Sequence, residues 1–195
     1  MNHELSNRQQ EIINVSLDLI AEGGIQALTI KNLAKKIGFA ESAIYRHYEN
    51  KIQILLAILN FFKENMSFLA ENGLLTEVNA IDRIEMLFQN YFKKFKNSPS
   101  LVTVIFSEEI FRNEKELAAK VAEIMKMNSE NIIGIISTGQ KTGEIRNDIA
   151  AAHLATILMG SLRLFVKQWH MSNYSFDITE KGQELINSIK KILQK

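Results

Sequence analysis

Residues 29–51 read TIKNLAKKIGFAESAIYRHYENK, and this stretch decides the fold of the chain. Apolar residues begin at Ile30 and recur at the i+3, i+4 and i+7 positions, which is the spacing of one face of an α-helix. A second, shorter helix is expected over residues 41–48. Two short helices joined by a tight turn predict a helix-turn-helix.

The residues around these two helices agree with that interpretation. Thr29 stands just before the apolar stripe, where a hydroxyl can cap the free backbone N–H groups of the first helix. Gly38 follows the stripe, where helices often end in a left-handed residue that costs glycine least. Ala34 is small enough for two helices to cross closely, and Ile44 and Tyr48 are expected to anchor the second helix in the core.

The closing residues YRHYENK add a resemblance to a known family. An aromatic residue, a histidine, a second aromatic residue and a lysine stand at Tyr45, His47, Tyr48 and Lys51. Their order and spacing resemble those of the TetR family of bacterial transcriptional repressors. The resemblance implies that the second helix lies in a DNA groove, and that the rest of the chain binds an effector.

Several residues are expected to hold the protein on the DNA backbone. Phosphate oxygens accept hydrogen bonds from hydroxyl and ammonium groups, so Thr29, Tyr45 and Lys51 are predicted phosphate contacts. The family resemblance implies the same role for Tyr45 and Lys51. His47 is expected either to contact phosphate or to pack against the partner helix.

Other residues are expected to reach base edges in the major groove. Ser42, Arg46 and Glu41 have suitable groups, with Glu41 accepting from a cytosine amine. Family members often have serine or threonine where Ala40 stands, and losing such a cap costs about 1 kcal/mol. Either Ser42 takes over the phosphate contact or the helix begins one residue later. The predicted DNA-binding residues are Thr29, Lys31, Glu41, Ser42, Ala43, Tyr45, Arg46, His47 and Lys51.

The charge of the chain is small but unevenly distributed. The net charge is +1, whereas residues 29–51 contain five basic and two acidic side chains, so the rest of the chain has a net charge of −2. A charged stretch alone is equally typical of a solvated helix face. Its coincidence with the helix-turn-helix favours a surface that faces phosphate.

Composition excludes several other classes of protein. The chain has 195 residues, of which 46% are hydrophobic, one is proline and none is cysteine. This predicts a mostly helical protein without disulfides, thiolate metal sites or a cysteine nucleophile. No apolar run approaches the roughly 18–20 residues of a membrane span, and the polar N-terminus does not resemble a secretory signal. We therefore expect a cytoplasmic protein without a membrane partner.

The apolar periodicity predicts an all-α fold with two domains. Residues 1–51 are expected to form a three-helix DNA-binding domain, and residues 52–195 a helical bundle for ligand binding and dimerisation. No glycine- or serine-rich linker separates them, which favours mechanical coupling through the helix that begins near Ile52. The other helices are expected from Ser6 to Gly23, Ile52 to Glu71, Glu77 to Lys96, Pro99 to Phe111, Asn113 to Lys141, Ile149 to Met171, and after Thr179. Their predicted N-caps include Ser6, Ser98, Asn113, and either Asn147 or Asp148.

The last two helices are too apolar for a simple monomer. Small residues at Ala155, Gly160 and Ser161 would let another helix approach closely. This pattern favours a four-helix contact between two copies, with an intramolecular core as the alternative. A dimer also suits a helix-turn-helix that binds two half-sites roughly 34–36 Å apart. The apolar residues of the penultimate helix are Leu154, Ile157, Leu158, Leu162, Phe165, Val166 and Trp169.

The family resemblance implies an apolar or amphipathic effector between the central helices. Aromatic and methionine side chains accumulate there, although such stripes more often form a core. The effector is expected to favour a dimer whose recognition helices no longer match the half-site spacing. The predicted ligand-binding residues are Phe62, Met66, Phe88, Tyr91, Phe92, Phe106, Met125, Asn128 and Phe165.

No enzyme activity, cofactor or metal is expected. The four histidines are scattered without the spacing of a metal site, and no phosphate-binding loop or nucleophile motif is present. The sequence therefore predicts a ligand-responsive repressor that binds a pseudo-palindromic operator as a homodimer. The alternative is a structural or nucleoid-associated DNA-binding protein of the same fold, controlled by a protein partner.

Overall fold

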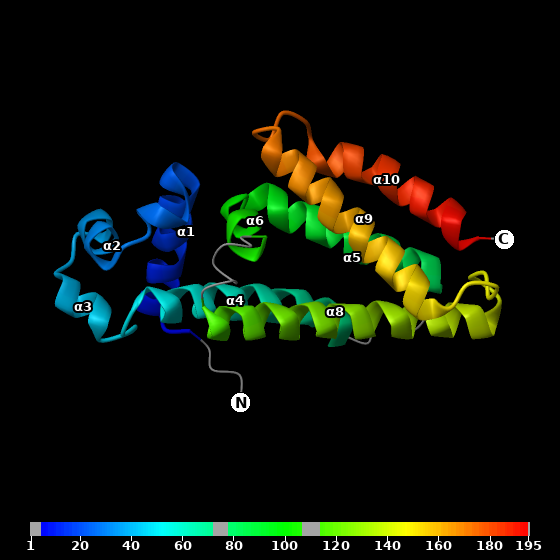
Figure 1. The fold of residues 1–195 in the computed structure, drawn as a ribbon, viewed down its shortest axis with the longest axis horizontal. Coiled ribbons are helices and arrows are strands. Elements are labelled where there is room, and N and C mark those ends of the chain that lie inside the picture. Colours follow the sequence, from blue (N-terminus) through cyan, green and yellow to red (C-terminus); the bar gives the residue numbers. More distant parts are fainter. Residues whose placement is uncertain (1–4, 72–77, 107–113, 195) are drawn as a thin grey trace. The chain divides into compact units, whose positions relative to one another are not determined.

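The computed structural model describes residues 5–71, 78–106 and 114–194. Every regular element in this part of the chain is an α-helix, which confirms the all-α prediction (Figure 1). None of these helices is both long and apolar enough to span a membrane. The helices are α1 (Asn7–Ala27), α2 (Ile30–Ile37), α3 (Glu41–Tyr45), α4 (Lys51–Glu71), α5 (Ala80–Asn97), α6 (Ser100–Ile105), α8 (Lys115–Thr142), α9 (Ala151–Met171) and α10 (Ile178–Leu193).

Contacts within the chain form two compact units. The first unit comprises Met1–Lys63 and Ser98–Val121, and the second comprises Glu64–Asn97 and Ala122–Lys195. Helices α4 and α8 contribute residues to both units. The first unit is larger than the predicted DNA-binding domain of residues 1–51, because it also contains the first part of α4 and the short helix α6.

Helix α1 begins where the sequence indicates and loses its helical backbone angles at the predicted end, Gly23 and Gly24. Ser6 and Gln9 form the predicted capping box, in which Ser6 Oγ accepts from the Gln9 backbone N–H at 3.3 Å and Gln9 Oε1 accepts from the Ser6 N–H at 3.0 Å. Gly23 and Gly24 leave the helical conformation, Gly24 with a φ of 67°, and a last short turn ends at Ala27. Within the first unit α1 packs against α2 and α6.

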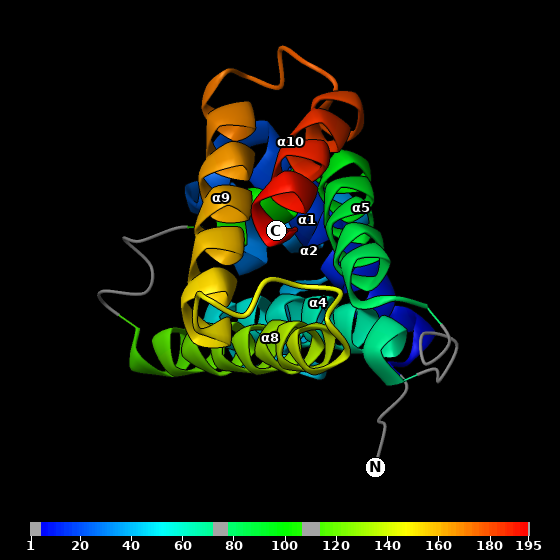
Figure 2. The same ribbon diagram turned by 90° about the vertical axis from the view of Figure 1, so that its right-hand side faces the viewer.

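In the second unit, α10 packs against both α5 and α9, and Figure 2 shows it between them. The approach to α5 is close because Gly182 of α10 faces the ring of Phe92. A Cβ atom added at Gly182 would lie 2.4 Å from Phe92 Cδ2. The Phe92 side chain is 1% exposed, and its ring meets those of Phe88 and Phe165. The packing of this core therefore requires glycine at position 182 as well as large apolar side chains.

Polar contacts at the start of α10 also bind it to α5. Asp177 accepts a hydrogen bond from Lys96 Nζ at 2.5 Å and another from the Thr179 backbone N–H at 2.8 Å. The ammonium of Lys96 and these further hydrogen bonds hold the pKa of the Asp177 carboxyl well below its usual range. Asp177 is the N-cap of α10, so the helix begins at Ile178, before the predicted start that follows Thr179.

Replacing Asp177 by asparagine is expected to make stability less sensitive to acid. A carboxyl whose pKa is lowered in the folded state stabilises the fold above its unfolded pKa of about 3.9, and this contribution is lost as the pH falls through and below that value. Asparagine can still cap α10 but carries no charge. We expect the melting temperature of wild type to exceed that of D177N at neutral pH, and the difference to shrink below about pH 4. A difference in melting temperature that stays constant as the pH is lowered would contradict the lowered pKa of Asp177.

The predicted cap of α9 is wrong. The helix begins at Ala151 rather than directly after Asn147 or Asp148, and Ala150 at its N-cap makes no side-chain bond. Asp148 instead accepts from Arg146 Nε at 2.7 Å and from Arg146 Nη2 at 2.6 Å. Two charge-assisted hydrogen bonds from an arginine are stronger than one hydrogen bond from a neutral backbone N–H. The Asp148 carboxylate therefore binds Arg146 rather than capping the helix.

The predicted start of α6 is also wrong by one residue. Pro99 stands at the N-cap and Ser100 is the first helical residue, so Ser98 does not cap the helix with its side chain. The predicted helix end at Phe111 and the predicted cap Asn113 both lie outside the described residues.

Candidate nucleic-acid interface

Helix α2 is capped at its N-terminus and at its C-terminus by the residues that the sequence indicates. Thr29 Oγ1 accepts from the Asn32 backbone N–H at 3.1 Å. Gly38 has a left-handed φ of 85°, and its N–H donates to the Ala34 carbonyl at 3.0 Å. Leu33 and Ala34 are buried. The turn between α2 and α3 is therefore the predicted glycine turn.

Helix α3 is shorter than predicted, since it ends at Tyr45 rather than Tyr48. The His47 N–H donates to the Ile44 carbonyl at 2.9 Å, which tightens the chain into an i→i+3 turn and ends the regular helix. Ile44 is fully buried and Tyr48 is 6% exposed, as predicted. Ala40 at the N-cap makes no side-chain hydrogen bond, so the helix begins at Glu41 without a side-chain cap.

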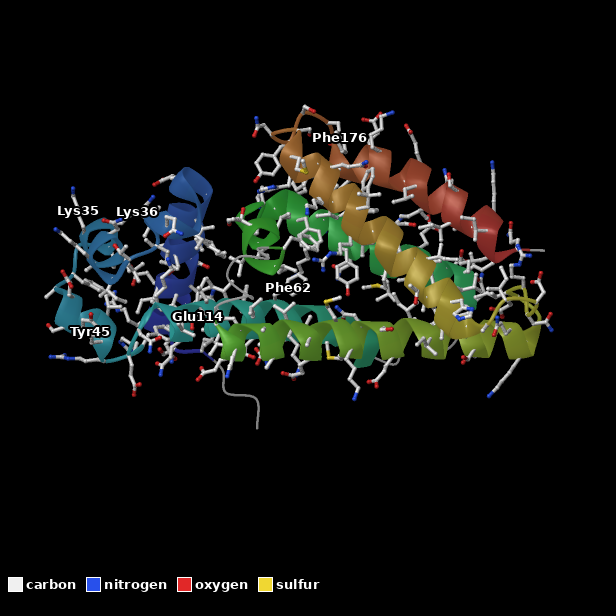
Figure 3. All side chains as sticks on the ribbon, viewed as in Figure 1. Lys35, Lys36, Tyr45, Phe62, Glu114 and Phe176 are labelled. Carbon is white, nitrogen blue, oxygen red and sulfur yellow. The ribbon has the colours of Figure 1, made fainter. Side chains whose placement is uncertain are left out.

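The side chains that were predicted to meet DNA from this helix are accessible. Tyr45 is 50% exposed. Figure 3 places Tyr45 on α3, and Lys35 and Lys36 on α2. The other exposed residues are Glu41, Ser42, Arg46 and His47, and Ala43 is partly exposed. Burial of Ile44 and Tyr48 therefore leaves the rest of this segment free to contact a ligand.

The basic side chains of the helix-turn-helix fall into two groups. Lys36 pairs with Glu22 of α1 at 2.5 Å. Lys31, Lys35 and Arg46 are exposed, and they have no hydrogen bond or ion pair within the described part of the chain. Lys31 and Lys35 are four residues apart and therefore share one face of α2. Lys35 was absent from the predicted set, although its spacing from Lys31 is the signal that would have identified it.

Lys51, a predicted phosphate contact, is engaged within the protein. Its Nζ donates to the backbone carbonyl of Ile25 at 2.5 Å. Partial burial lowers the pKa of Lys51. This lysine therefore differs from Lys31 and Lys35 of α2, which are exposed and make no hydrogen bond within the described part of the chain.

The predicted ligand-binding residues are divided between the two units. Phe62 and Phe106 belong to the first unit, whereas Met125 and Asn128 belong to the second. Met125 is 50% exposed and Asn128 is partly exposed. The side chain of Met66 lies outside those that the structure describes.

Aromatic rings in the second unit form a connected cluster. The centroids of Phe92 and Phe165 are 5.4 Å apart, and those of Phe165 and Phe176 are 5.6 Å apart. Phe88, Tyr91 and Phe92 are buried in the core, and burial raises the pKa of Tyr91. Phe165 is partly exposed. Phe176, which Figure 3 labels, was not predicted because it precedes α10 in a loop, where helical periodicity gives no signal.

Helix α9 carries an apolar stripe that remains exposed in the single chain. Ile157, Leu164 and Met171 are seven residues apart and are 44%, 58% and 71% exposed. Gly160 lies between the first two and is also exposed. On α10, Ile192 is 40% exposed. A repeat of seven residues is the spacing at which one helix packs along another.

Two family models match the chain. One is described as bacterial regulatory proteins, tetR family, and matches residues 12–58. The other is described as YsiA-like protein, C-terminal region, and matches residues 62–192. The chain belongs to the TetR family. The resemblance inferred from YRHYENK is confirmed, and the chain is a DNA-binding transcriptional regulator of this family.

Relatives of this TetR-family protein include a metabolic regulator and a nucleoid protein. The chain is 24% identical over 189 residues to the fatty acid metabolism regulator protein of Bacillus subtilis, which covers 95% of this chain and 93% of that protein. It is also 24% identical over 180 residues to the nucleoid occlusion factor SlmA of Mannheimia succiniciproducens, which covers 89% and 83%.

Solved structures confirm the fold. FadR from Bacillus halodurans superposes with a TM-score of 0.85 at 18% identity, covering 96% of both chains. FadR from Bacillus subtilis in complex with stearoyl-CoA superposes with a TM-score of 0.77 at 22% identity, covering 95% of this chain and 99% of that one. The chain therefore has the fold of these solved structures.

Proposed function

We propose that this TetR-family protein is a repressor that binds a pseudo-palindromic operator as a homodimer and releases it when an apolar or amphipathic effector binds. The observation that carries this proposal is the exposed helix α3 together with Lys31, Lys35 and Arg46, which have no hydrogen bond or ion pair among the described residues. A recognition helix reads base edges in the major groove, while cations beside it neutralise phosphates. The protein would act in the bacterial cytoplasm, where its operator lies.

We assign the DNA contacts by the chemistry of each exposed group. Arg46 can donate two hydrogen bonds to a guanine, Ser42 can donate or accept, and Glu41 can accept from a cytosine amine. The hydroxyls of Thr29 and Tyr45 can donate to phosphate oxygens. The remaining residues of the proposed interface are Lys31, Ala43 and His47. Lys51, which the sequence predicts as a phosphate contact, instead donates to the carbonyl of Ile25.

A second copy of the chain is the proposed partner of α9 and α10. The exposed stripe formed by Ile157, Leu164 and Met171 is apolar and has a seven-residue repeat, which suits packing against a helix of the same kind. Ile192 would extend this surface onto α10. A two-fold dimer presents two recognition helices to two half-sites, which a monomer does not.

We infer that the effector has a long apolar part, and that long-chain acyl-CoA is the first compound class to test. FadR from Bacillus subtilis was solved with stearoyl-CoA, and its fold matches nearly the whole chain. Phe165 and Phe176 lie at the partly exposed edge of the aromatic cluster in the second unit and supply apolar surface of the appropriate kind. The proposed ligand-binding residues remain those predicted from the sequence, namely Phe62, Met66, Phe88, Tyr91, Phe92, Phe106, Met125, Asn128 and Phe165.

Footprinting on DNA upstream of the protein's own gene and of its neighbours tests this function. We expect a protected pseudo-palindrome at moderate salt, and loss of protection on adding a long-chain acyl-CoA but not free CoA. The same acyl-CoA should raise the melting temperature, because a ligand present at 100 times its Kd stabilises the folded state by about 2.7 kcal/mol. Trp169 is the only tryptophan, so its fluorescence provides a second binding assay.

Two results would contradict parts of the proposal. Protection that persists with every acyl-CoA would contradict this effector class. Weak binding without a protected site would contradict sequence-specific repression, and would favour a nucleoid-associated protein controlled by a protein partner. The SlmA relative has the same 24% identity as the fatty acid regulator, so identity does not separate the alternatives. The two FadR structures favour the repressor.

A further inference from the structure

One hydrogen bond joins the two residues that flank the helix-turn-helix, residues 26–50. Lys51 is the first residue of α4, and its Nζ donates to the carbonyl of Ile25 in the last turn of α1 at 2.5 Å. The whole helix-turn-helix, residues 26–50, lies between these two residues. Lys51 therefore closes a loop that contains α2, the glycine turn and α3.

The electrostatics of the α4 N-terminus favour this contact. The N-terminus of a helix carries a partial positive charge, so a cation gains nothing from the dipole of α4 at its first residue. The Ile25 carbonyl belongs to the short turn that follows the glycine kink, and a backbone carbonyl oxygen in such a position can accept a hydrogen bond from an ammonium group. The Ile25 carbonyl also accepts from the Leu28 N–H, but at 3.3 Å. The ammonium of Lys51 thus supplies the shorter and charge-assisted bond.

The glycine kink in α1 explains why such a bond would matter. Gly23 and Gly24 have non-helical backbone angles, so the turn at residues 25–27 is not a regular continuation of α1. Leu28, which follows that turn, is fully buried, and Thr29 then caps α2. A restraint on Ile25 therefore acts at the point from which α2 departs.

We propose that Lys51 is a positioning residue, which clamps the ends of residues 26–50 and fixes the orientation of α2 and α3 for entry into the groove. It acts through the Ile25 carbonyl rather than by neutralising a phosphate. The clamp is a property of the free protein, and only its consequence for DNA affinity rests on the proposed function.

Hydrogen exchange of the free full-length protein tests the clamp directly. Lys51→Met keeps the apolar stem but removes every donor, and we expect exchange within residues 26–50 to rise about tenfold while α5 and α10 are unchanged. A tenfold change corresponds to about 1.4 kcal/mol, close to the lower end of the net value of a hydrogen bond to a charged group. Lys51→Arg keeps a charged donor and should restore most of the protection. The matched control, Lys35→Met, removes an exposed cation of the same segment and should leave exchange unchanged.

Salt dependence of DNA binding separates the clamp from a phosphate contact. Losing one phosphate contact lowers the slope of log K against log salt by about one, which is expected for Lys35→Met. Lys51→Met should instead weaken binding at every salt concentration with an unchanged slope, and Lys51→Arg should recover affinity.

The outcomes distinguish the proposals. Unchanged hydrogen exchange in Lys51→Met overturns the clamp, and a slope reduced by about one would then identify Lys51 as the phosphate contact predicted from the sequence. If wild type binds no DNA, the proposed function fails, while the exchange data still decide the clamp. If Lys51→Met does not fold, Lys51→Arg decides: retained protection supports the clamp, and wild-type folding with lost protection overturns it.

Discussion

Leu164→Arg is expected to make the protein monomeric and to weaken operator binding by about 100-fold or more. Leu164 is 58% exposed and lies at the centre of the α9 stripe between Ile157 and Met171. In a two-fold contact between copies of α9, each arginine would be buried close to its own symmetry mate. Unpaired buried charges of like sign are costly, so the interface should not form. Two half-sites would then be bound independently, without the 10²–10⁴-fold gain that linkage of two binding modules gives.

The matched control for this change is Met86→Arg. Met86 is 42% exposed on α5, outside the proposed interface, and receives the same new charge. Light scattering should give about twice the chain mass of 22.3 kDa for wild type and Met86→Arg, and the chain mass for Leu164→Arg. A dimeric Leu164→Arg, or a monomeric wild type at micromolar concentration, would show that this surface is not the dimer contact.

Gly182→Ala is expected to lower the free energy of unfolding by about 1–3 kcal/mol, although alanine is the better helix former. The added Cβ would lie 2.4 Å and 2.5 Å from two ring carbons of Phe92. That ring is 1% exposed and meets Phe88 and Phe165, so it has no free space into which to turn. Helix α10 would have to shift away from α5, which loosens the core of the second unit.

Gly134→Ala is the control that separates packing from helix propensity. Gly134 lies within α8, and nothing is found within 4 Å of a Cβ added there. We expect this substitution to raise the free energy of unfolding by about 0.5–1 kcal/mol. Urea unfolding at equal protein concentrations measures both variants, because dimerisation makes apparent stability concentration-dependent. If both substitutions change the free energy of unfolding in the same direction, the close contact between Gly182 and Phe92 is contradicted.

The helix-turn-helix could be predicted from the sequence because its signals act over a few residues. The Thr29 cap bonds to a backbone N–H three residues away, and Gly38 is required by a left-handed angle at its own position. The inward positions of Ile44 and Tyr48 follow from the spacing of apolar residues along one helix. Once those two side chains are buried, the exposure of Tyr45 and Arg46 follows from the same geometry.

Other predictions failed where two groups competed for one partner. Asp148 has the right residue type and position to cap a helix, but Arg146 occupies both of its carboxylate oxygens. At α10 the actual cap is Asp177, whose charge is also paired with Lys96 of α5. Asp177 accepts from Lys96 with Oδ2 and caps α10 with Oδ1, whereas Arg146 donates to both oxygens of Asp148. Residue type alone does not tell which acidic side chain has an oxygen left for the cap.

The sequence by itself determined the all-α fold, the family and the exposed face of α3, because periodicity, capping and turn geometry are encoded within each short segment. Tertiary structure alone decided that Gly182 meets Phe92 and that Lys51 meets Ile25. Both contacts join helices that are separate in the chain. A glycine within a helix either lowers helix stability or allows a close contact, and only the tertiary neighbours decide which. The same holds for a lysine, which either faces solvent or donates to a carbonyl.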